Sequence, residues 1–87
     1  MKEDLIPGPE LGQRLKEIRL RAGLKQADVG ERMGLSGAGV ANSVARLENG
    51  RVRNPSLRTL LLFLRACDAS LYELAGVLEG TPGVEST

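Results

Sequence analysis

The sequence predicts an all-α fold of five short helices. Apolar side chains recur at helical spacing in several segments, as Leu11, Leu15 and Ile18 do. The chain has one Phe, one Tyr and no Trp, so its core must be aliphatic, which suits packed helices better than a β-sandwich. Residue types that start and stop helices stand at the ends of these segments. We therefore expect a single small helical domain.

Composition excludes several classes of protein. The 87 residues suffice for one domain with one core. No apolar run approaches the ~18 residues that cross a membrane, and the N-terminus lacks the apolar region of a signal peptide, so we expect a cytoplasmic protein. The chain has no histidine and one cysteine, Cys67, which we interpret as a small buried hydrophobe. A Cys/His zinc site or a His-dependent triad cannot be built, and we expect no metal, no cofactor and no enzymatic activity.

Charge is distributed unevenly along the chain. Residues 11–66 carry 11 Lys and Arg against four acidic residues, whereas 1–10 and 67–87 are net acidic. A basic body suggests a polyanionic partner such as nucleic acid. The alternative is that these side chains only solvate helix faces.

The first half of the chain contains two predicted helices. Residues 1–8 form a flexible acidic arm, and Pro9 suits the first position of a helix over 9–21 that Gly23 ends. A second helix is expected over about 26–33. Its Gly30 is small enough for another helix to approach closely, and a glycine-rich turn follows it.

The third predicted helix spans about 38–48, with Val40, Val44 and Leu47 on one face. Its start is ambiguous, because Gly37 and Gly39 favour helix poorly and could extend the turn instead. We favour a start within 37–39.

Two further helices are predicted after a basic loop. The segment from 55 or 56 to 67 is apolar nearly all round, which predicts the central core helix. Ser70 and Glu73 form a capping box that opens a fifth helix. Gly80 begins a disordered tail, 80–87, so that the folded domain spans 9–79.

The combination of motifs resembles the phage-repressor/Cro-type (lambda-repressor-like) helix-turn-helix family over about 11–78. The matching residues are Leu11-Gly12-x-Arg14-Leu15, Gly23-Leu24-x-Gln26, Gly34-Leu35-Ser36, Arg46-Leu47-Glu48-Asn49-Gly50 and Asn54-Pro55-Ser56-Leu57. The resemblance implies a compact five-helix domain. In this family the second helix braces the DNA backbone and the third enters the major groove.

The sequence departs from the family pattern in one place. Ser36 and Glu48 are 12 positions apart, where the family has about eight. Four residues is close to one helical turn, so the excess within 37–40 either lengthens the third helix or widens the turn.

The exposed face of the third helix supplies the candidates for reading bases. Arg46 can donate two hydrogen bonds to guanine, and Asn42 can form a bidentate contact with adenine. The alternatives are an ion pair of Arg46 with Glu31 or Glu48 and a local backbone bond of Asn42. The remaining candidates on this helix are Ser43, Ala41 and Ala45.

Other residues are candidates for holding the DNA backbone. The resemblance implies that Gln26 contacts phosphate, and Lys25 replaces the expected helix cap, either to meet a phosphate or as a surface lysine. Asn49, Arg51 and Arg53 follow the third helix and are expected to grip the flanking backbone. A solvated basic loop is the alternative.

One ion pair is implied by the resemblance. The family bonds an arginine of the first helix to the glutamate that closes the third, and the matching positions here are Arg19 and Glu48. We expect this pair to be structural.

These observations predict a sequence-specific regulator of double-stranded DNA, either a repressor or an antitoxin-like autoregulator with a protein partner such as a toxin. We expect a homodimer on a palindromic operator, located with the nucleoid. The candidate dimer surface is Leu71, Tyr72, Leu74 and Leu78, which could instead be core. The alternative function is a protein–protein adaptor that keeps the fold without reading DNA. Basic residues gathered on one face would favour DNA.

Overall fold

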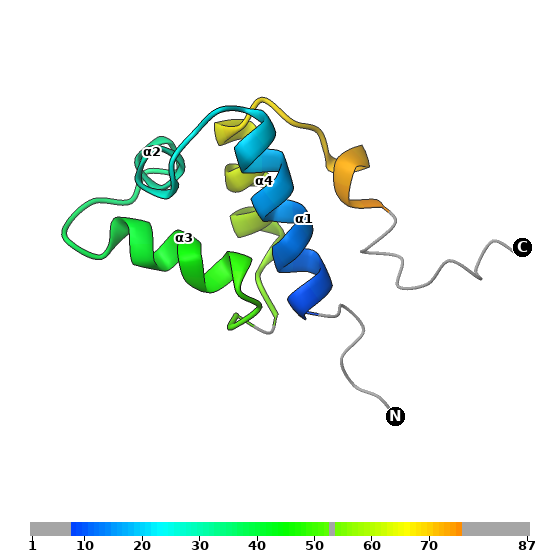
Figure 1. Ribbon diagram of the computed structural model, residues 1–87, viewed down its shortest axis with the longest axis horizontal. Coiled ribbons are helices and arrows are strands. Elements are labelled where there is room, and N and C mark those ends of the chain that lie inside the picture. Colours follow the sequence, from blue (N-terminus) through cyan, green and yellow to red (C-terminus); the bar gives the residue numbers. More distant parts are fainter. Residues whose placement is uncertain (1–7, 53, 76–87) are drawn as a thin grey trace, which may run out of the picture.

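The computed structural model of the protein describes residues 8–52 and 54–75. These residues form four α-helices and one short 3₁₀-helix (Figure 1). The elements are α1 (Gly8–Arg21), α2 (Gln26–Arg32), α3 (Val40–Glu48), α4 (Leu57–Ala66) and the 3₁₀-helix η1 (Leu71–Leu74). The predicted arm, apart from Gly8, and the predicted tail lie outside the described residues. None of the described helices is long and apolar enough to cross a membrane.

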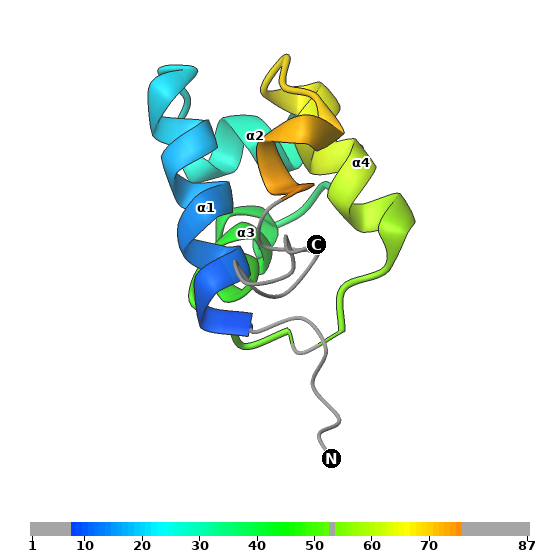
Figure 2. The ribbon, with the colours of Figure 1, turned by 90° about the vertical axis from the view of Figure 1, so that its right-hand side faces the viewer.

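The helices enclose a small aliphatic core. α2 and α3 pack on each other, α1 packs on α3, and α4 packs on α2. Figure 2 shows α1 and α4 on either side of α2, with α3 at the other end of the molecule from the last turn of α4. The fully buried side chains are contributed by every element, namely Leu15, Val29, Val44, Phe63, Leu64 and Leu74. Because every element contributes to this core, the core fixes the orientation of α3 relative to the other helices.

The four α-helices end with the same hydrogen-bonding pattern. After Arg32, the last residue of α2, the Gly34 N–H donates to the Glu31 carbonyl at 3.0 Å and the Leu35 N–H donates to the Gly30 carbonyl at 2.9 Å. This is a Schellman motif, which requires a positive φ at the first residue after the C-cap. The residues that adopt it are Gly23, Gly34, Gly50 and Asp68. All four helices thus stop where the sequence places a residue that tolerates this conformation.

The start of α3 corrects one prediction. The helix begins at Val40, not within 37–39, so the extra residues widen the turn instead of lengthening the helix. Gly37 has a φ of +98°, outside the helical region, and this conformation ends any continuation of α3 toward its N-terminus. Gly39 is the N-cap and has no side chain to cap the helix.

The prediction of five helices is corrected in part: residues 71–74 form the 3₁₀-helix η1, Ala75 is helical, and the rest of the predicted fifth helix lies outside the described residues. The Ser70 hydroxyl makes no capping hydrogen bond. The Glu73 carboxylate is instead bound by the Arg21 guanidinium at 2.8 Å. The predicted capping box therefore does not form, and the Glu73 N–H donates to the Ser70 carbonyl in a tight i to i+3 turn.

Helix α4 contributes Leu60, Phe63, Leu64 and Ala66 to the core, as predicted for a core helix, but it is not buried all round. Leu57 and Leu61 are 59% and 39% exposed, whereas Leu60, Phe63 and Leu64 are buried. α4 lies at the side of the domain (Figure 2), so only one of its faces meets other helices. Its N-terminus is as predicted: Ser56 is the N-cap, and its hydroxyl accepts a hydrogen bond from the Thr59 N–H at 3.1 Å.

Cys67 lies at the end of α4 and is buried. Burial raises the pKa of its thiol above the ordinary value, and the charge of Glu48 raises that pKa further. The thiol therefore stays protonated at neutral pH, as expected of a small core side chain.

Helix α1 approaches the end of α3 so closely that only glycine fits at position 12. A Cβ on Gly12 would meet the Glu48 carbonyl and would lie 2.7 Å from the Leu47 carbonyl oxygen. Both contacts are with backbone, which cannot move aside without shifting a helix.

We expect Gly12→Ala to lower the free energy of unfolding by about 1–3 kcal/mol because of this overpacking. Glycine-to-alanine changes inside helices ordinarily stabilise by about 0.5–1 kcal/mol, so the sign itself is diagnostic. Urea unfolding followed by circular dichroism measures the effect. Gln13→Ala, at the exposed neighbouring position, is the control and should change little. A stabilised Gly12→Ala chain would contradict the close approach.

Candidate nucleic-acid interface

Helix α3 has one buried and one exposed face. Val40, Val44 and Leu47 face the core. The exposed stripe, as we call it, consists of Asn42, Arg46 and Asn49, at i, i+4 and i+7. It leaves α3 with a polar surface that no other described element covers.

The candidate base-reading residues differ in how available they are. Arg46 and Asn42 are exposed. The alternative was an ion pair of Arg46 with Glu31 or Glu48, and neither pair is present among the described residues. Glu48 is bound by Arg19 instead. Ser43 is exposed, but its hydroxyl donates to the Gly39 carbonyl at 3.1 Å, so it bonds locally.

The two alanines of α3, Ala41 and Ala45, are half-buried. They border the exposed stripe, and their short side chains do not extend beyond the longer side chains of that stripe.

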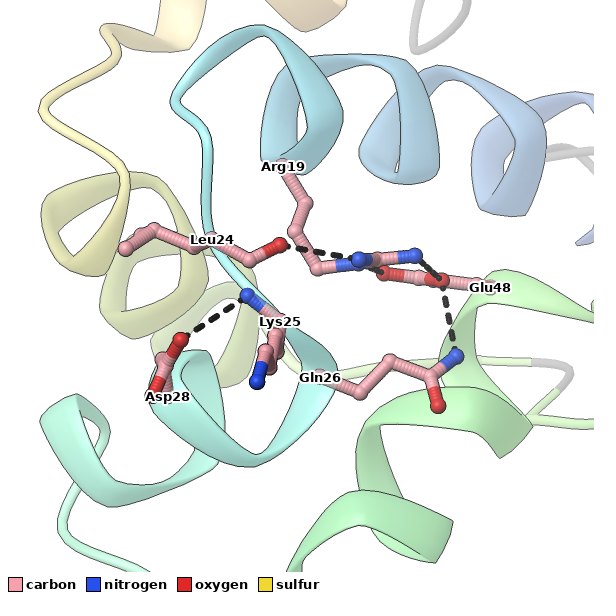
Figure 3. A network of polar contacts seen from close by, with 6 residues as sticks. All are labelled: Arg19, Leu24, Lys25, Gln26, Asp28 and Glu48. Atoms are coloured by element: carbon pink, nitrogen blue, oxygen red, sulfur yellow. Dashed lines mark hydrogen bonds and ion pairs between the residues drawn. The ribbon is translucent and has the colours of Figure 1, made fainter.

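A buried ion pair joins α1 to the end of α3 (Figure 3). The Arg19 Nε donates to the Glu48 Oε2 at 2.6 Å, and the Arg19 Nη2 donates to Oε1 at 3.0 Å. The Arg19 Nη1 donates to the Leu24 carbonyl at 2.9 Å, in the turn before α2. The pair therefore links α1, the α1–α2 turn and α3 through one guanidinium group.

Gln26 extends this network to α2. Its Nε2 donates to the Glu48 Oε1 at 3.1 Å, and the residue is half-buried. The resemblance implies a phosphate contact for Gln26, and no local sequence pattern indicates this bond to Glu48. It places the first residue of α2 beside the last residue of α3.

Lys25 precedes α2 in extended conformation and is exposed. The Asp28 carboxylate accepts a hydrogen bond from the Lys25 backbone N–H at 2.9 Å. Asp28 therefore holds the start of the helix, and the Lys25 ammonium is left to solvent (Figure 3). This division of roles explains how α2 begins without a Ser or Thr cap.

The loop after α3 carries exposed Asn49 and Arg51. The Arg51 N–H donates to the Arg46 carbonyl at 2.9 Å, which holds the loop against the end of α3. Arg53 lies outside the described residues. Because Gln26 is bonded to Glu48, the described phosphate candidates Lys25, Gln26, Asn49 and Arg51 lie near the C-terminal end of α3.

The candidate dimer surface is only partly exposed. Tyr72 is 88% exposed and Leu71 is exposed as well. Leu74 is completely buried and belongs to the core, because η1 turns this side chain inward, so its assignment to a dimer surface is wrong. Leu78 lies outside the described residues.

Comparison with known proteins identifies the family. The protein family described as "Helix-turn-helix domain" has a sequence model that matches residues 10–76 of this chain. A solved structure, the restriction-modification controller protein C.AhdI from Aeromonas hydrophila, is 35% identical to the chain, with a TM-score of 0.65. The match covers 76% of this chain and 92% of that protein. No curated protein sequence matched.

Removing Arg19 tests how much the buried pair contributes to the fold. Arg19→Met should lower the free energy of unfolding by about 3–5 kcal/mol, because it leaves the Glu48 charge buried without a partner. Urea unfolding provides the measurement. The matched control is Arg14→Met, which breaks the exposed Arg14–Glu17 pair of 3.2 Å and should cost no more than about 1 kcal/mol. Equal losses of unfolding free energy in the two variants would mean that burial does not increase the contribution of the Arg19–Glu48 pair to stability.

Proposed function

We propose, since the chain belongs to the helix-turn-helix domain family, that this DNA-binding transcriptional regulator recognises a specific double-stranded site by placing α3 in the major groove. The observation that carries the proposal is the exposed stripe of α3, flanked at its C-terminal end by Lys25, Gln26 and Arg51. A helix fits the major groove, and groups on either side of it meet the phosphates.

Within this arrangement Arg46 and Asn42 are the residues that read bases. Their side chains have the donors and acceptors that match guanine and adenine in the major groove. Ala41 and Ala45 allow α3 to approach the groove floor, and Ser43 contributes only after its bond to Gly39 is exchanged.

Lys25, Gln26, Asn49 and Arg51 hold the sugar–phosphate backbone, and Arg53 joins them from the same loop. The common location of Lys25, Gln26, Asn49 and Arg51 supports DNA as the partner over a protein adaptor, whose cations would have no reason to gather beside one helix.

The protein acts as a homodimer on a palindromic operator, in the cytoplasm with the nucleoid. Leu71 and Tyr72 are the surface through which two copies associate, and their exposure supports this assignment. A repressor or an antitoxin-like autoregulator, paired with a protein such as a toxin, is the role we favour. The similarity to a controller protein supports a regulator of transcription in either case.

Selection from a random duplex pool at about 150 mM salt, where non-specific binding is weak, tests the proposal. We expect an enriched motif with two-fold symmetry, because two copies would each read one half-site. A folded protein that enriches no motif would overturn sequence-specific recognition.

Arg46→Ala should relax selectivity at one base position of each half-site, by about 1–3 kcal/mol for the preferred base. The motif recovered by the variant, compared with that of the unaltered chain, provides the measurement. Arg65→Ala is the control, because Arg65 is an exposed cation in the last turn of α4 and α4 is no part of the proposed interface. An unchanged motif would remove Arg46 from the base-reading residues.

Arg51→Ala should weaken binding to all sequences alike. Each lost phosphate contact by a cation lowers the slope of log K against log salt by about 1. Titrations at several salt concentrations measure the slope, and Arg65→Ala again serves as control. A slope equal to that of the unaltered chain would show that Arg51 does not touch the backbone.

A further inference from the structure

We infer that Glu48 is a positioning residue for DNA binding, because it fixes which atoms of Gln26 face the phosphate backbone. The inference rests on the proposed function, since it concerns how one contact of that interface is prepared. It assigns to the buried ion pair a second role in addition to holding α1 against α3.

The Glu48 carboxylate is itself held rigidly. Only 2% of its side chain is exposed, and Arg19 binds both of its oxygens. Oε1 accepts in addition from the Gln26 Nε2 at 3.1 Å. A carboxylate fixed by a bidentate arginine cannot rotate toward Gln26 or away from it, so the Gln26 amide must adapt to the carboxylate.

The chemistry of the two groups determines how the amide adapts. The two ends of a glutamine amide are similar in shape, but one donates and the other accepts hydrogen bonds. An ionised carboxylate only accepts. Glu48 therefore selects the orientation in which the Gln26 Nε2 points inward (Figure 3). One N–H of that nitrogen remains for a phosphate oxygen. The opposite orientation would offer both N–H groups to the phosphate, but it would point the amide oxygen at the carboxylate, which cannot donate a hydrogen bond.

This arrangement gives the contact a distinctive property. Gln26 is neutral, so its bond to phosphate releases no counterion and adds nothing to the salt slope. Its loss should weaken binding to all duplexes without changing that slope, unlike the loss of Arg51. A neutral contact held in advance also avoids part of the entropy cost of ordering a side chain on binding.

Nuclear magnetic resonance of the unaltered chain tests the geometry. A scalar coupling across the hydrogen bond should join the Gln26 Nε2 to the Glu48 carboxyl carbon. On addition of a mixed-sequence duplex of about 20 base pairs, two helical turns, the Gln26 side-chain amide signals should shift. Gln13, which is exposed and lies 3.5 Å from the Glu17 carboxylate, is an internal control whose signals should not shift.

The outcomes separate the two proposals. Shifts in the backbone signals of α3 without a shift at Gln26, or the absence of the coupling to Glu48, would overturn the positioning role and leave the proposed function intact. No shift at α3 or at Gln26 at low salt would overturn both.

A double-mutant cycle tests whether Glu48 acts through Gln26. Gln26→Ala should weaken duplex binding roughly tenfold, as expected for a hydrogen bond to a charged group. Glu48→Gln lets the Gln26 amide turn over. As a single substitution it should weaken binding severalfold, and in the Gln26→Ala background it should weaken binding no further. The salt slope should stay constant on Gln26→Ala, which changes no charge.

Additive effects of the two substitutions would show that Glu48 acts through the fold alone and would overturn the inference. Phe63→Leu, a core change without polar contact to the network, controls for lost stability and should leave binding unchanged under conditions where it is folded. Should Glu48→Gln fail to fold, as circular dichroism would show, the coupling measured in the unaltered chain decides the question.

Discussion

The buried pair of Arg19 and Glu48 is the interaction on which the rest of the domain depends. Removing two charges from water costs several kcal/mol per ion, and the cost is recovered only when the geometry is good and the remaining hydrogen-bonding groups are satisfied. Here the arginine is bidentate to the carboxylate and also donates to the Leu24 carbonyl. No buried side-chain polar atom in the described part of the chain lacks a partner. The pair thus joins α1, the following turn and the end of α3 at one place. Hydrogen bonds are directional, so they fix the relative position of these segments more closely than apolar packing would.

The same point is also where the main chains come closest. Gly12 of α1 lies against the Leu47 and Glu48 carbonyls, directly beside the ion pair. Side-chain charge and backbone contact therefore fix the same end of α3 in two independent ways. At the other end, Gly30 of α2 leaves room for Val40. α3 is held at both ends, and its polar face remains free of other described elements, which is the condition for a helix that must enter a groove without distortion.

Much of this arrangement could be predicted from the sequence, and what could not has physical reasons. The spacing of Val40, Val44 and Leu47 identified the buried face of α3 because a helix has one fixed period. The start of α3 was less certain, since glycine permits both helix and turn. The Glu73 carboxylate binds Arg21, 52 positions away, instead of forming the predicted capping box. The burial of Leu74, the one-sided packing of α4 and the bond of Gln26 to Glu48 likewise depend on contacts between distant elements. Local patterns contain no information about such contacts.

The wide turn between α2 and α3 has a consequence for how this fold can vary. α2 and α3 contact each other directly, where Val40 packs against the Gly30 backbone and where Gln26 bonds to Glu48. Closing a longer flexible connection costs little, because the entropy loss grows only with the logarithm of its length. The connection is therefore a tolerant site for insertions and deletions, and its length can drift between relatives while the helix pair keeps its geometry. Alignments that demand a constant spacing between these helices would overlook domains of this kind.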